Sequence, residues 1–394
     1  MGMLRVTGYA LGVLFLVAGC TSATLKPESE APDVSEAEPM VLTEMPAKTV
    51  TPAASSAPSV PLVESAPAAE PATTSPATLP PIHIRGPMNR PEAYAFVEEM
   101  ARLYNFDRVQ LAKLFSQIKP RPKVVEAISR PAEAQPWHKY RPRFIQAQRI
   151  DKGVAFWRAN TKYFDAAQAQ FGVPPEIVAA ILGVETLYGK HAGGFRVVDS
   201  LATLGFDYAP RAAFFRKELQ EFLILSREQG WDPRAIQGSY AGAMGLGQFM
   251  PSSYRRFAVD FDGDGKRDLH RSTADAIGSV AYYLQQHGWG AGAPIVTQAS
   301  TQGETYTRFI SRDFKAETPL AEMRDNGVTW DATIVAERAG LFELENTGGK
   351  EHWLGFPNFY AITRYNRSVL YSMAVYELAQ EILRGNAVRL TESN

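Results

Sequence analysis

One glutamate, Glu185, stands in an apolar run that reads ILGVETLYG over residues 181–189. The spacing predicts a helix that starts at Pro174-Pro175 and is apolar on most faces, as buried helices are. Burial disfavours a charged carboxyl group, and so does the negative end of a helix dipole. Both effects are expected to raise the pKa of Glu185, so that it could donate a proton to a leaving oxygen. The alternative is a structural Glu185 paired with an arginine or lysine.

A second segment, SYAGAMGLGQFMPSSY at 239–254, combines small residues with neutral polar and aromatic side chains. Its alanines and glycines allow the backbone to approach another surface or a ligand closely. Ser239 and Gln248 add neutral hydrogen-bonding groups, and Phe249 is one of three aromatic residues. A carbohydrate, which has hydroxyl groups and an apolar ring face, suits this combination. A tightly packed helical hairpin would explain the small residues as well.

An acidic segment, DFDGDGKRDLHRSTADAIGS, opens like the calcium loop of an EF-hand. Asp260, Asp262 and Asp264 take the first three ligand positions, Gly265 allows the turn, and Lys266 would contribute its backbone carbonyl. The twelfth position carries an arginine, where an EF-hand has glutamate. The pattern predicts a structural calcium ion, and the alternative is an acidic turn exposed to solvent. The six histidines show no spacing typical of a zinc site.

The elements that must position these motifs are mainly helical. Residues 91–106 and 107–118 have apolar residues at helical spacing, with Asp107 as the expected N-cap of the second helix. Residues 149–172 are expected to form one further helix that ends at a glycine, and helix returns at 368–383. We find no internal repeat.

The region from about residue 295 to 356 has a different pattern. It is rich in alternating and β-branched residues, and it contains the turn signals Asn326-Gly327 and Gly348-Gly349. We expect a small β-rich insertion here.

The N-terminus reads MGMLRVTGYALGVLFLVAGC and contains the single cysteine of the chain, Cys20. The apolar stretch after Arg5 is too short to span a bilayer and is typical of a secretory signal. Its end, Val-Ala-Gly-Cys, resembles the lipobox of bacterial lipoproteins, which implies cleavage before Cys20 and its lipidation. Because Thr21 rather than aspartate follows, that resemblance implies the periplasmic face of the outer membrane. The alternative is a chance cysteine after an ordinary signal.

Residues 21–81 hold twelve of the 27 prolines and no aromatic residue, which predicts a disordered tether. They carry eight acidic residues and two lysines, a net charge of −6. Residues 82–394 carry 38 basic and 34 acidic residues, a net charge of +4. A mildly basic body suits a polyanionic partner, but no block of lysine and arginine predicts nucleic acid.

Together the two motifs GVETLYG and SYAGAMGLGQFMPSSY closely resemble the membrane-bound lytic murein transglycosylase B family. The resemblance runs from about Trp137 to Tyr371 and continues through WHKYRPRF, RIDKGVAFW, DAIGSVAYYL and ITRYNRS. It implies a lysozyme-like core that cleaves the β-1,4 bond between N-acetylmuramic acid and N-acetylglucosamine. It implies no cofactor for the chemistry, and peptidoglycan glycan strands as the partner. No motif identifies partners among the proteins of cell-wall synthesis.

The resemblance also assigns roles to residues. Glu185 matches the family's catalytic acid/base, and Ser239 and Gln248 match the residues that hold the saccharide near the cleaved bond. Asp275 matches the acid that closes the family's calcium loop, whereas Asp268 is left unassigned. Five further residues would line the groove: Tyr140, Phe249, Tyr365, Asn366 and Tyr371. Arg211 would meet the lactyl carboxylate or the peptide stem. For Tyr140 and Arg211 the match is by spacing, and ordinary packing is the alternative.

A second carboxylate is not indicated by any motif, although Asp199, Asp207 and Glu218 are near in sequence. Most glycosidases use two carboxylates. The resemblance implies that Glu185 acts alone and that the product is a 1,6-anhydromuramoyl end. The alternatives are a hydrolytic N-acetylmuramidase and a non-catalytic peptidoglycan-binding lipoprotein.

The expected fold is α+β and mainly α-helical, with a lysozyme-like core, an added helical region and a small β-rich insertion behind a disordered tether. The expected divisions are a signal peptide at 1–19, a lipidated cysteine and tether at 20–84, a helical catalytic region at 85–290 with an EF-hand-like loop at 260–275, the β-rich insertion at 291–356, and a C-terminal helical part at 357–394.

Overall fold

The computed structural model describes residues 81–129, 135–310 and 314–391. The predicted signal peptide, the lipidation site Cys20 and all but the last residues of the predicted tether lie outside these ranges. Within the described part, Ile84 is buried, and its N–H donates a hydrogen bond of 2.9 Å to the hydroxyl of Tyr94. The packed part of the chain therefore includes Ile84, which the predicted boundary at residue 84 assigned to the tether.

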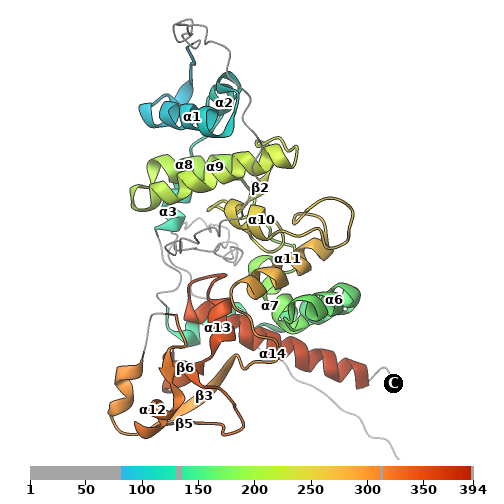
Figure 1. Ribbon diagram of the computed structural model, residues 1–394, viewed down its shortest axis with the longest axis vertical. Helices are drawn as coiled ribbons and strands as arrows, with labels where there is room; N and C mark the ends of the chain where they lie inside the picture. The colour runs from blue at the N-terminus through green and yellow to red at the C-terminus, as the bar shows by residue number, and fades with distance from the viewer. Residues whose placement is uncertain (1–80, 130–134, 311–313, 392–394) are drawn as a thin grey trace, which may run out of the picture. The chain divides into compact units, whose positions relative to one another are not determined.

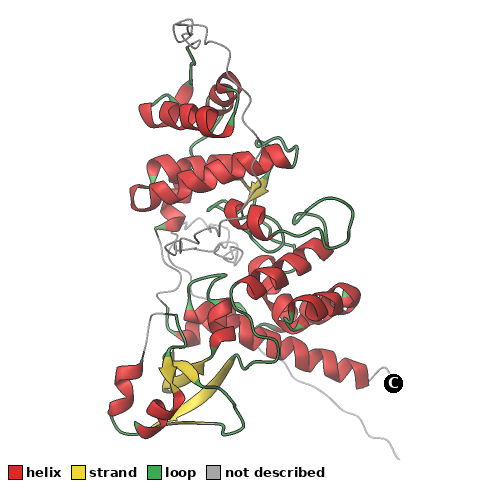
Figure 2. Cartoon of the chain, viewed as in Figure 1, coloured by secondary structure: helices red, strands yellow, loops and turns green. Residues whose placement is uncertain are grey.

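The described chain is mainly α-helical with one small five-stranded sheet, which confirms the predicted α+β class (Figures 1 and 2). The α-helices are α1 (Pro91–Tyr104), α2 (Arg108–Phe115), α3 (Pro122–Ile128), α4 (Trp137–Tyr140), α5 (Ala147–Ala159), α6 (Thr161–Phe171), α7 (Pro175–Thr186), α8 (Val197–Asp207), α9 (Ala212–Glu228), α10 (Pro251–Phe257), α11 (Thr273–Gln286), α12 (Leu320–Asp325), α13 (Pro357–Ile362) and α14 (Val369–Thr391). The 3₁₀ helices are η1 (Gly86–Met88), η3 (Arg141–Arg143), η4 (Ala209–Arg211) and η5 (Thr305–Phe309).

The strands are β1 (Phe195–Arg196), β2 (Gln237–Gly238), β3 (Val296–Thr301), β4 (Thr318–Pro319), β5 (Val328–Trp330), β6 (Arg338–Asn346) and β7 (Gly349–Gly355). The five-stranded sheet has the order β4-β6-β7-β3-β5, and its neighbouring strands are antiparallel. β6 and β7 form a hairpin in which Asn346 pairs with Gly349, at the predicted Gly348-Gly349 turn.

The two faces of the sheet pack against different cores, as the side-chain period of two requires. Leu341 and Leu354 join a small core that also contains Phe309, Met323 and Val328. The intervening residues of β6 face the main helical core, where the ring of Phe342 stacks on that of Phe359 with centroids 4.9 Å apart. The sheet is thus anchored to α13, which packs against α11 and α14, the helices that in turn contact α7.

The segment 149–172, predicted as a single helix, forms two helices, α5 and α6. The break is at Asn160, whose side-chain nitrogen donates a hydrogen bond of 2.8 Å to the carbonyl of Phe156. An asparagine side chain that binds the backbone in this way competes with helical hydrogen bonding. The predicted end is confirmed, because Gly172 has a left-handed conformation at the C-terminus of α6. Asp107 is likewise confirmed as the N-cap of α2, accepting from the N–H of Gln110.

Helix α7, which carries Glu185, packs against α5, α6, α11 and α14. Within it every residue except Glu176 is buried. This is why its sequence is apolar on most faces rather than along one stripe.

The segment 239–250 is a loop between β2 and α10, and not the helical hairpin that the sequence left open. We call it the 239–250 loop. Met244 and Phe249 exchange two backbone hydrogen bonds of 2.9 Å across it. Glycines with positive φ at 242 and 245 allow the chain to turn twice within a few residues.

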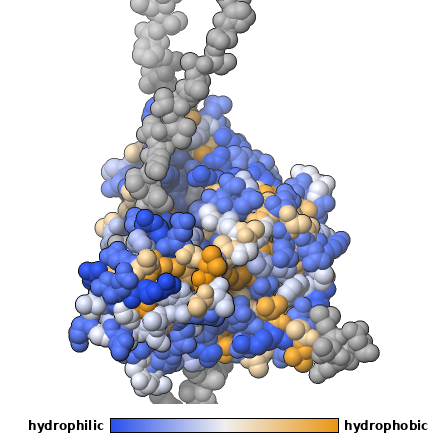
Figure 3. Space-filling model, turned by 60° about the horizontal axis from the view of Figure 1, so that its bottom comes forward, coloured by the Kyte–Doolittle hydropathy of each residue, from blue (hydrophilic) through white to orange (hydrophobic). Residues whose placement is uncertain are grey.

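The surface carries few large exposed apolar side chains among the described residues: Leu103, Val109, Val335, Leu383 and Val388. The face shown in Figure 3 is accordingly mainly hydrophilic, with apolar residues gathered in smaller areas. In the described ranges, none of the helices has the length and apolar character needed to cross a membrane.

Candidate active site

Glu185 is almost completely buried, with 2% of its surface exposed, one residue before the end of α7. Its Oε1 accepts a hydrogen bond of 2.5 Å from the hydroxyl of Tyr371 on α14. The packing of α7 against α14 therefore brings together two residues that are far apart in the sequence.

Burial raises the pKa of Glu185 to about 8, and the hydrogen bond from Tyr371 opposes part of this rise. Among the ion pairs of the described residues, none involves Glu185. A buried carboxyl group with no cationic partner favours its neutral, protonated form. The arrangement has the properties of a general acid near neutral pH and lacks those of a structural ion pair.

Two further tyrosines interact electrostatically with Glu185 or with its partner Tyr371. Tyr365 is fully buried, and its hydroxyl donates a hydrogen bond of 2.7 Å to the carbonyl of Gly247 in the 239–250 loop. Burial, with the charge of Glu185 as a second cause, raises the pKa of Tyr365. The pKa of Tyr371 is raised by burial, by Glu185 and also by Tyr140, which places all three tyrosines within electrostatic range of the site.

Thr186 connects α7, the helix of Glu185, to the 239–250 loop, and the sequence analysis missed it. Its hydroxyl donates a hydrogen bond of 2.8 Å to the carbonyl of Leu246 and accepts one of 2.9 Å from the N–H of Gly189. A threonine after a glutamate gives no signal of this role, because the partner is 60 residues away.

The chain leaves α7 through two consecutive left-handed residues, Leu187 with φ of 50° and Tyr188 with φ of 61°. Such conformations are unfavourable for residues other than glycine, and they are maintained by the surrounding contacts. The hydroxyl of Tyr188 donates a hydrogen bond of 3.1 Å to the carbonyl of Arg149. A Cβ atom added to Gly153 or to Gly183 would lie only 2.4 Å from this hydroxyl oxygen, which is closer than real Cβ contacts. Both positions therefore require glycine.

The two residues predicted to hold the saccharide, Ser239 and Gln248, lie at opposite ends of the 239–250 loop. The hydroxyl of Ser239 accepts a hydrogen bond of 3.0 Å from the N–H of Ala243. Gln248 has a left-handed backbone with φ of 50°. Its side-chain nitrogen donates a hydrogen bond of 2.9 Å to the carbonyl of Gly245. It also donates 3.3 Å to the carbonyl of Ala192 in the segment after α7.

The remaining predicted groove residues are located as follows. Phe249 is fully buried and packs edge-on against Tyr365, with centroids 5.8 Å apart. Tyr140 is buried and stacks on Trp137. Asn366 is buried in the turn between α13 and α14, where its carbonyl accepts from the N–H of Ser368.

Arg211 lies at the end of η4, with its guanidinium 4.3 Å from the ring centroid of Phe214. Its pKa is lowered by burial, and the charge of Glu218 opposes this shift. The structure thus places Arg211 against Phe214 of α9, whereas Tyr371 contacts Glu185.

The three acids near Glu185 in sequence are engaged elsewhere. Asp199 is buried and pairs with Arg196 at 2.8 Å, and Asp207 pairs with Arg90 at 2.7 Å. Glu218 accepts hydrogen bonds from Ser252. Only burial and Tyr371 act on the pKa of Glu185, and no second carboxylate of the described residues contributes to it.

The acidic loop has the donor set of a hard-cation site. Carboxylate oxygens of Asp260, Asp262 and Asp264 all lie within 4.8 Å of one another on the surface. The carboxylate of Asp260 accepts from the N–H groups of Gly263, Asp264 and Gly265, and so folds the loop around itself. The N–H of Lys266 donates 2.8 Å to Asp264.

Asp275 connects this loop to α11. It is buried, and its two oxygens accept from the N–H groups of Phe261, at 2.8 Å, and Asp268, at 2.7 Å. Ser272 is the N-cap of α11, and its hydroxyl donates a hydrogen bond of 2.7 Å to the carboxylate of Asp262. The residues present therefore suit a calcium ion.

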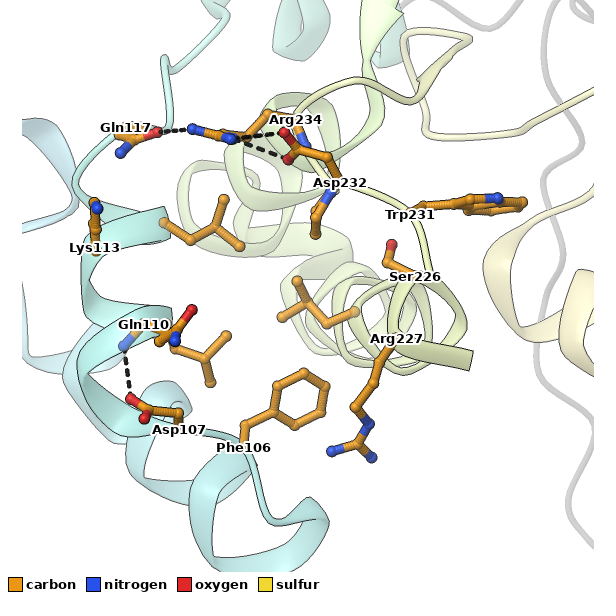
Figure 4. Close-up of a pocket in the computed structure, with 14 residues that line it drawn as sticks. Phe106, Asp107, Gln110, Lys113, Gln117, Ser226, Arg227, Trp231, Asp232 and Arg234 are labelled. Atoms are coloured by element: carbon orange, nitrogen blue, oxygen red, sulfur yellow. Dashed lines mark hydrogen bonds and ion pairs between the residues drawn. The ribbon is translucent and has the colours of Figure 1, made fainter. Parts of the chain in front are cut away.

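A separate hollow of about 400 Å³ lies between α2 and α9 (Figure 4). Arg234 stands at its rim and donates hydrogen bonds to Asp232 and Gln117. None of the predicted site residues lines this hollow, so it is distinct from the surroundings of Glu185.

Comparison with known proteins agrees with this geometry. Residues 89–380 match the family described as the transglycosylase SLT domain. The chain is 39% identical over 305 residues to membrane-bound lytic murein transglycosylase B of Escherichia coli (strain K12), which covers 75% of this chain and 83% of that protein.

Solved structures are similar over the same part of the chain. Soluble lytic transglycosylase SltB1 from Pseudomonas aeruginosa is 48% identical, with a TM-score of 0.72 over 75% of this chain and all of that one. Escherichia coli Slt35 in complex with calcium is 38% identical, with a TM-score of 0.72 over 77% of this chain and 97% of that one. Pseudomonas aeruginosa SltB3 in complex with NAG-anhNAM-pentapeptide is 32% identical, with a TM-score of 0.66 over 74% of this chain and 78% of that one.

These likenesses confirm the predicted lysozyme-like core. The chain belongs to the transglycosylase SLT domain family and is a peptidoglycan lytic transglycosylase.

Proposed function

We propose that this enzyme cleaves the β-1,4 bond between N-acetylmuramic acid and N-acetylglucosamine with Glu185 as its single acid/base, and that it leaves a 1,6-anhydromuramoyl end. The observation that carries the proposal is the state of Glu185. It is buried, its pKa is raised to about 8, and its hydrogen-bond partner, Tyr371, is uncharged. A carboxyl group in this state can first donate a proton and then take one back.

The reaction would proceed in two proton transfers. Protonated Glu185 gives its proton to the glycosidic oxygen as the bond to C1 breaks, and the substrate's 2-acetamido oxygen stabilises C1. The resulting carboxylate of Glu185 accepts the proton of the muramoyl C6 hydroxyl, whose oxygen bonds to C1. Glu185 ends protonated, and water is neither consumed nor released. The hydrogen bond from Tyr371 would stabilise the carboxylate between the two steps.

Substrate recognition is proposed for the residues around this carboxyl group. Ser239 and Gln248 would bind the saccharide near the cleaved bond. Five residues would line the groove: Tyr140, Phe249, Tyr365, Asn366 and Tyr371. Arg211 would meet a carboxylate of the lactyl group or the peptide stem. The contacts of Tyr365 with Gly247 and of Tyr371 with Glu185 support this proposal, and so does the peptidoglycan fragment bound to SltB3.

We also propose a structural calcium ion in the acidic loop, held by Asp260, Asp262 and Asp264 with the carbonyl of Lys266 and with Asp275. The oxygen-rich cluster of the three aspartates and the calcium complex of Slt35 support it. The ion would fix the loop and the start of α11, and would take no part in proton transfer.

For localisation we propose a lipid anchor at Cys20, exposed after removal of residues 1–19, and a tether within the predicted segment 20–84 that connects it to the body, to which the buried Ile84 belongs. This would hold the enzyme at the periplasmic face of the outer membrane. The membrane-bound relative of Escherichia coli supports a membrane location. We retain the proposed division of the body into a helical catalytic region at 85–290, a β-rich insertion at 291–356 and a helical part at 357–394.

Digestion of purified sacculi tests the catalytic proposal. Mass spectrometry of the wild-type digest should find anhydromuramic ends, and the Glu185→Gln variant should release none. Reducing muramic ends without anhydro ends would indicate a muramidase. Lysis by the Glu185→Gln variant would contradict the role of Glu185, and intact sacculi with the wild type would indicate a binding protein.

A further inference from the structure

Glu218 is a buried carboxylate that the proposed chemistry does not use. It lies in α9 with 3% of its surface exposed. One oxygen accepts a hydrogen bond of 3.0 Å from the N–H of Ser252, and the other accepts one of 2.6 Å from the Ser252 hydroxyl. Both oxygens are thus committed to a single residue, 34 positions further along the chain.

Ser252 lies in the first turn of α10, the helix that follows the 239–250 loop. Ser252 is the second residue of α10, and Met250, at the N-cap position, provides no side-chain cap. The first N–H groups of a helix need acceptors from outside it. Glu218 supplies the acceptor for Ser252 from a neighbouring helix, where a carboxylate is favourable because of the helix dipole.

The loop needs such an anchor because its backbone is unfavourable on its own. Gln248, four residues before Ser252, has a φ of 50°, which residues other than glycine rarely adopt. Conformations of this kind persist only when the surrounding contacts fix them. Contacts of Thr186 with Leu246 and of Tyr365 with Gly247 fix the loop before Gln248. After Gln248, the chain is fixed by the bridge between Phe249 and Met244 and by Glu218.

We propose that Glu218 is a positioning residue, which holds the 239–250 loop in the conformation that binds the saccharide by fixing Ser252. The inference rests on the proposed function of Gln248 in that loop. Glu218 also lies within electrostatic range of Arg211, the proposed contact of the substrate carboxylate.

Kinetics with solubilised glycan strands test this proposal. Glu218→Met, which removes both acceptors, should raise KM about tenfold and leave kcat within about twofold. Ser252→Ala removes the hydroxyl donor and keeps the N–H donor, so it should raise KM by less than Glu218→Met, and the double variant should be no worse than Glu218→Met. Glu218→Gln should recover part of the affinity, because its amide offers one oxygen to the N–H and an NH₂ group to the hydroxyl of Ser252.

The matched control is Glu221→Met. Glu221 lies on the same helix and pairs with Arg255 of α10, so its removal weakens the contact of α9 with α10 without releasing Ser252. Its KM should stay within about twofold of wild type. An equal rise in KM for both methionine variants would overturn the proposal, and so would an unchanged KM in Glu218→Met. If Glu218→Met fails to fold, Ser252→Ala against Glu221→Met decides the question.

Binding separates this inference from the catalytic proposal. Cosedimentation with sacculi compares Glu185→Gln with the Glu185→Gln, Glu218→Met double variant, and it needs no turnover. About tenfold weaker binding by the double variant supports the role of Glu218 even if the products contradict the anhydro mechanism. Equal binding overturns it even if anhydro ends are formed.

Discussion

The hydroxyl of Tyr371 donates a hydrogen bond of 2.5 Å to Oε1 of Glu185, between residues 186 positions apart. This bond lowers the pKa of Glu185, whereas burial raises it by more. An arginine or lysine in the same place would fix the carboxylate in its charged form. A phenol instead leaves Glu185 able to gain and lose a proton near neutral pH, which an acid/base residue requires.

Removal of this bond should shift the pH dependence of the enzyme. In Tyr371→Phe the charged form of Glu185 loses its donor, so its pKa should rise further above 8. Activity of the acid falls as pH increases through that pKa, and this fall should move to higher pH by about one unit. The measurement is kcat/KM against pH, which reports the free enzyme.

Tyr283→Phe is the control for this shift. Tyr283 is also buried, and its hydroxyl donates a hydrogen bond of 2.6 Å to the carbonyl of Arg364. The variant loses one tyrosine hydrogen bond but none to Glu185, so its profile should match wild type. A Tyr371→Phe profile that matches wild type would show that Tyr371 does not act on the proton of Glu185.

The stability of the protein should depend on pH through Glu185. Its pKa in the folded state, about 8, exceeds the ordinary value of 4.5 expected in the unfolded chain. Between these values the folded state binds more protons, so the free energy of unfolding falls as pH rises. Glu185→Gln lacks this contribution. Its stability relative to wild type should therefore increase from about pH 5 to about pH 8, by on the order of 1 kcal/mol per pH unit. Urea denaturation of both proteins measures this difference, and parallel curves would contradict the raised pKa.

Thr186→Val should reduce both stability and activity. The isosteric change removes the donor to Leu246 and leaves the N–H of Gly189 without its acceptor. A cost of about 1–3 kcal/mol in the free energy of unfolding is expected, together with a lower kcat. Thr203→Val is the control. Thr203 is also buried, and its hydroxyl donates a hydrogen bond to the carbonyl of Asp199 and accepts one from the N–H of Arg121. This variant should lose similar stability but no activity. Equal activity in the two variants would refute a role in activity for the link that Thr186 makes between α7 and the 239–250 loop.

Calcium should stabilise the protein through the acidic loop. Added calcium should raise the melting temperature, because a ligand that binds only the folded state stabilises it, by about 2.7 kcal/mol at a hundredfold excess over Kd. Asp262→Asn should abolish the response, whereas Asp331→Asn, an exposed aspartate that binds Thr333, should retain it. Calorimetric scans with calcium or a chelator measure the effect. A wild-type melting temperature that is the same in both would argue against the site.

Much of the fold was predictable where local sequence determines local structure. The apolar spacing of α1, the cap at Asp107 and the glycine that ends α6 all act within a few residues. The break at Asn160 was missed because apolar periodicity continues across it, and the side chains of Asn160 and Thr161 bind backbone carbonyls of the preceding turn.

The burial of Glu185 was predictable from the sequence, whereas its contacts were not. The apolar neighbours of Glu185 indicated its burial and the direction of its pKa shift. Tyr371 was expected as a groove residue, and nothing in the sequence indicated that it donates to Glu185. Thr186 and Glu218 were not identified, because their partners are brought to them only by tertiary packing.

The most direct test of the central claim is digestion of sacculi in water enriched in heavy oxygen, followed by mass spectrometry of the muramoyl ends. If Glu185 accepts the proton of the C6 hydroxyl and water takes no part, the products should be anhydromuramoyl ends without the label. Reducing ends that carry one heavy oxygen would show that water attacks C1, and would contradict the account.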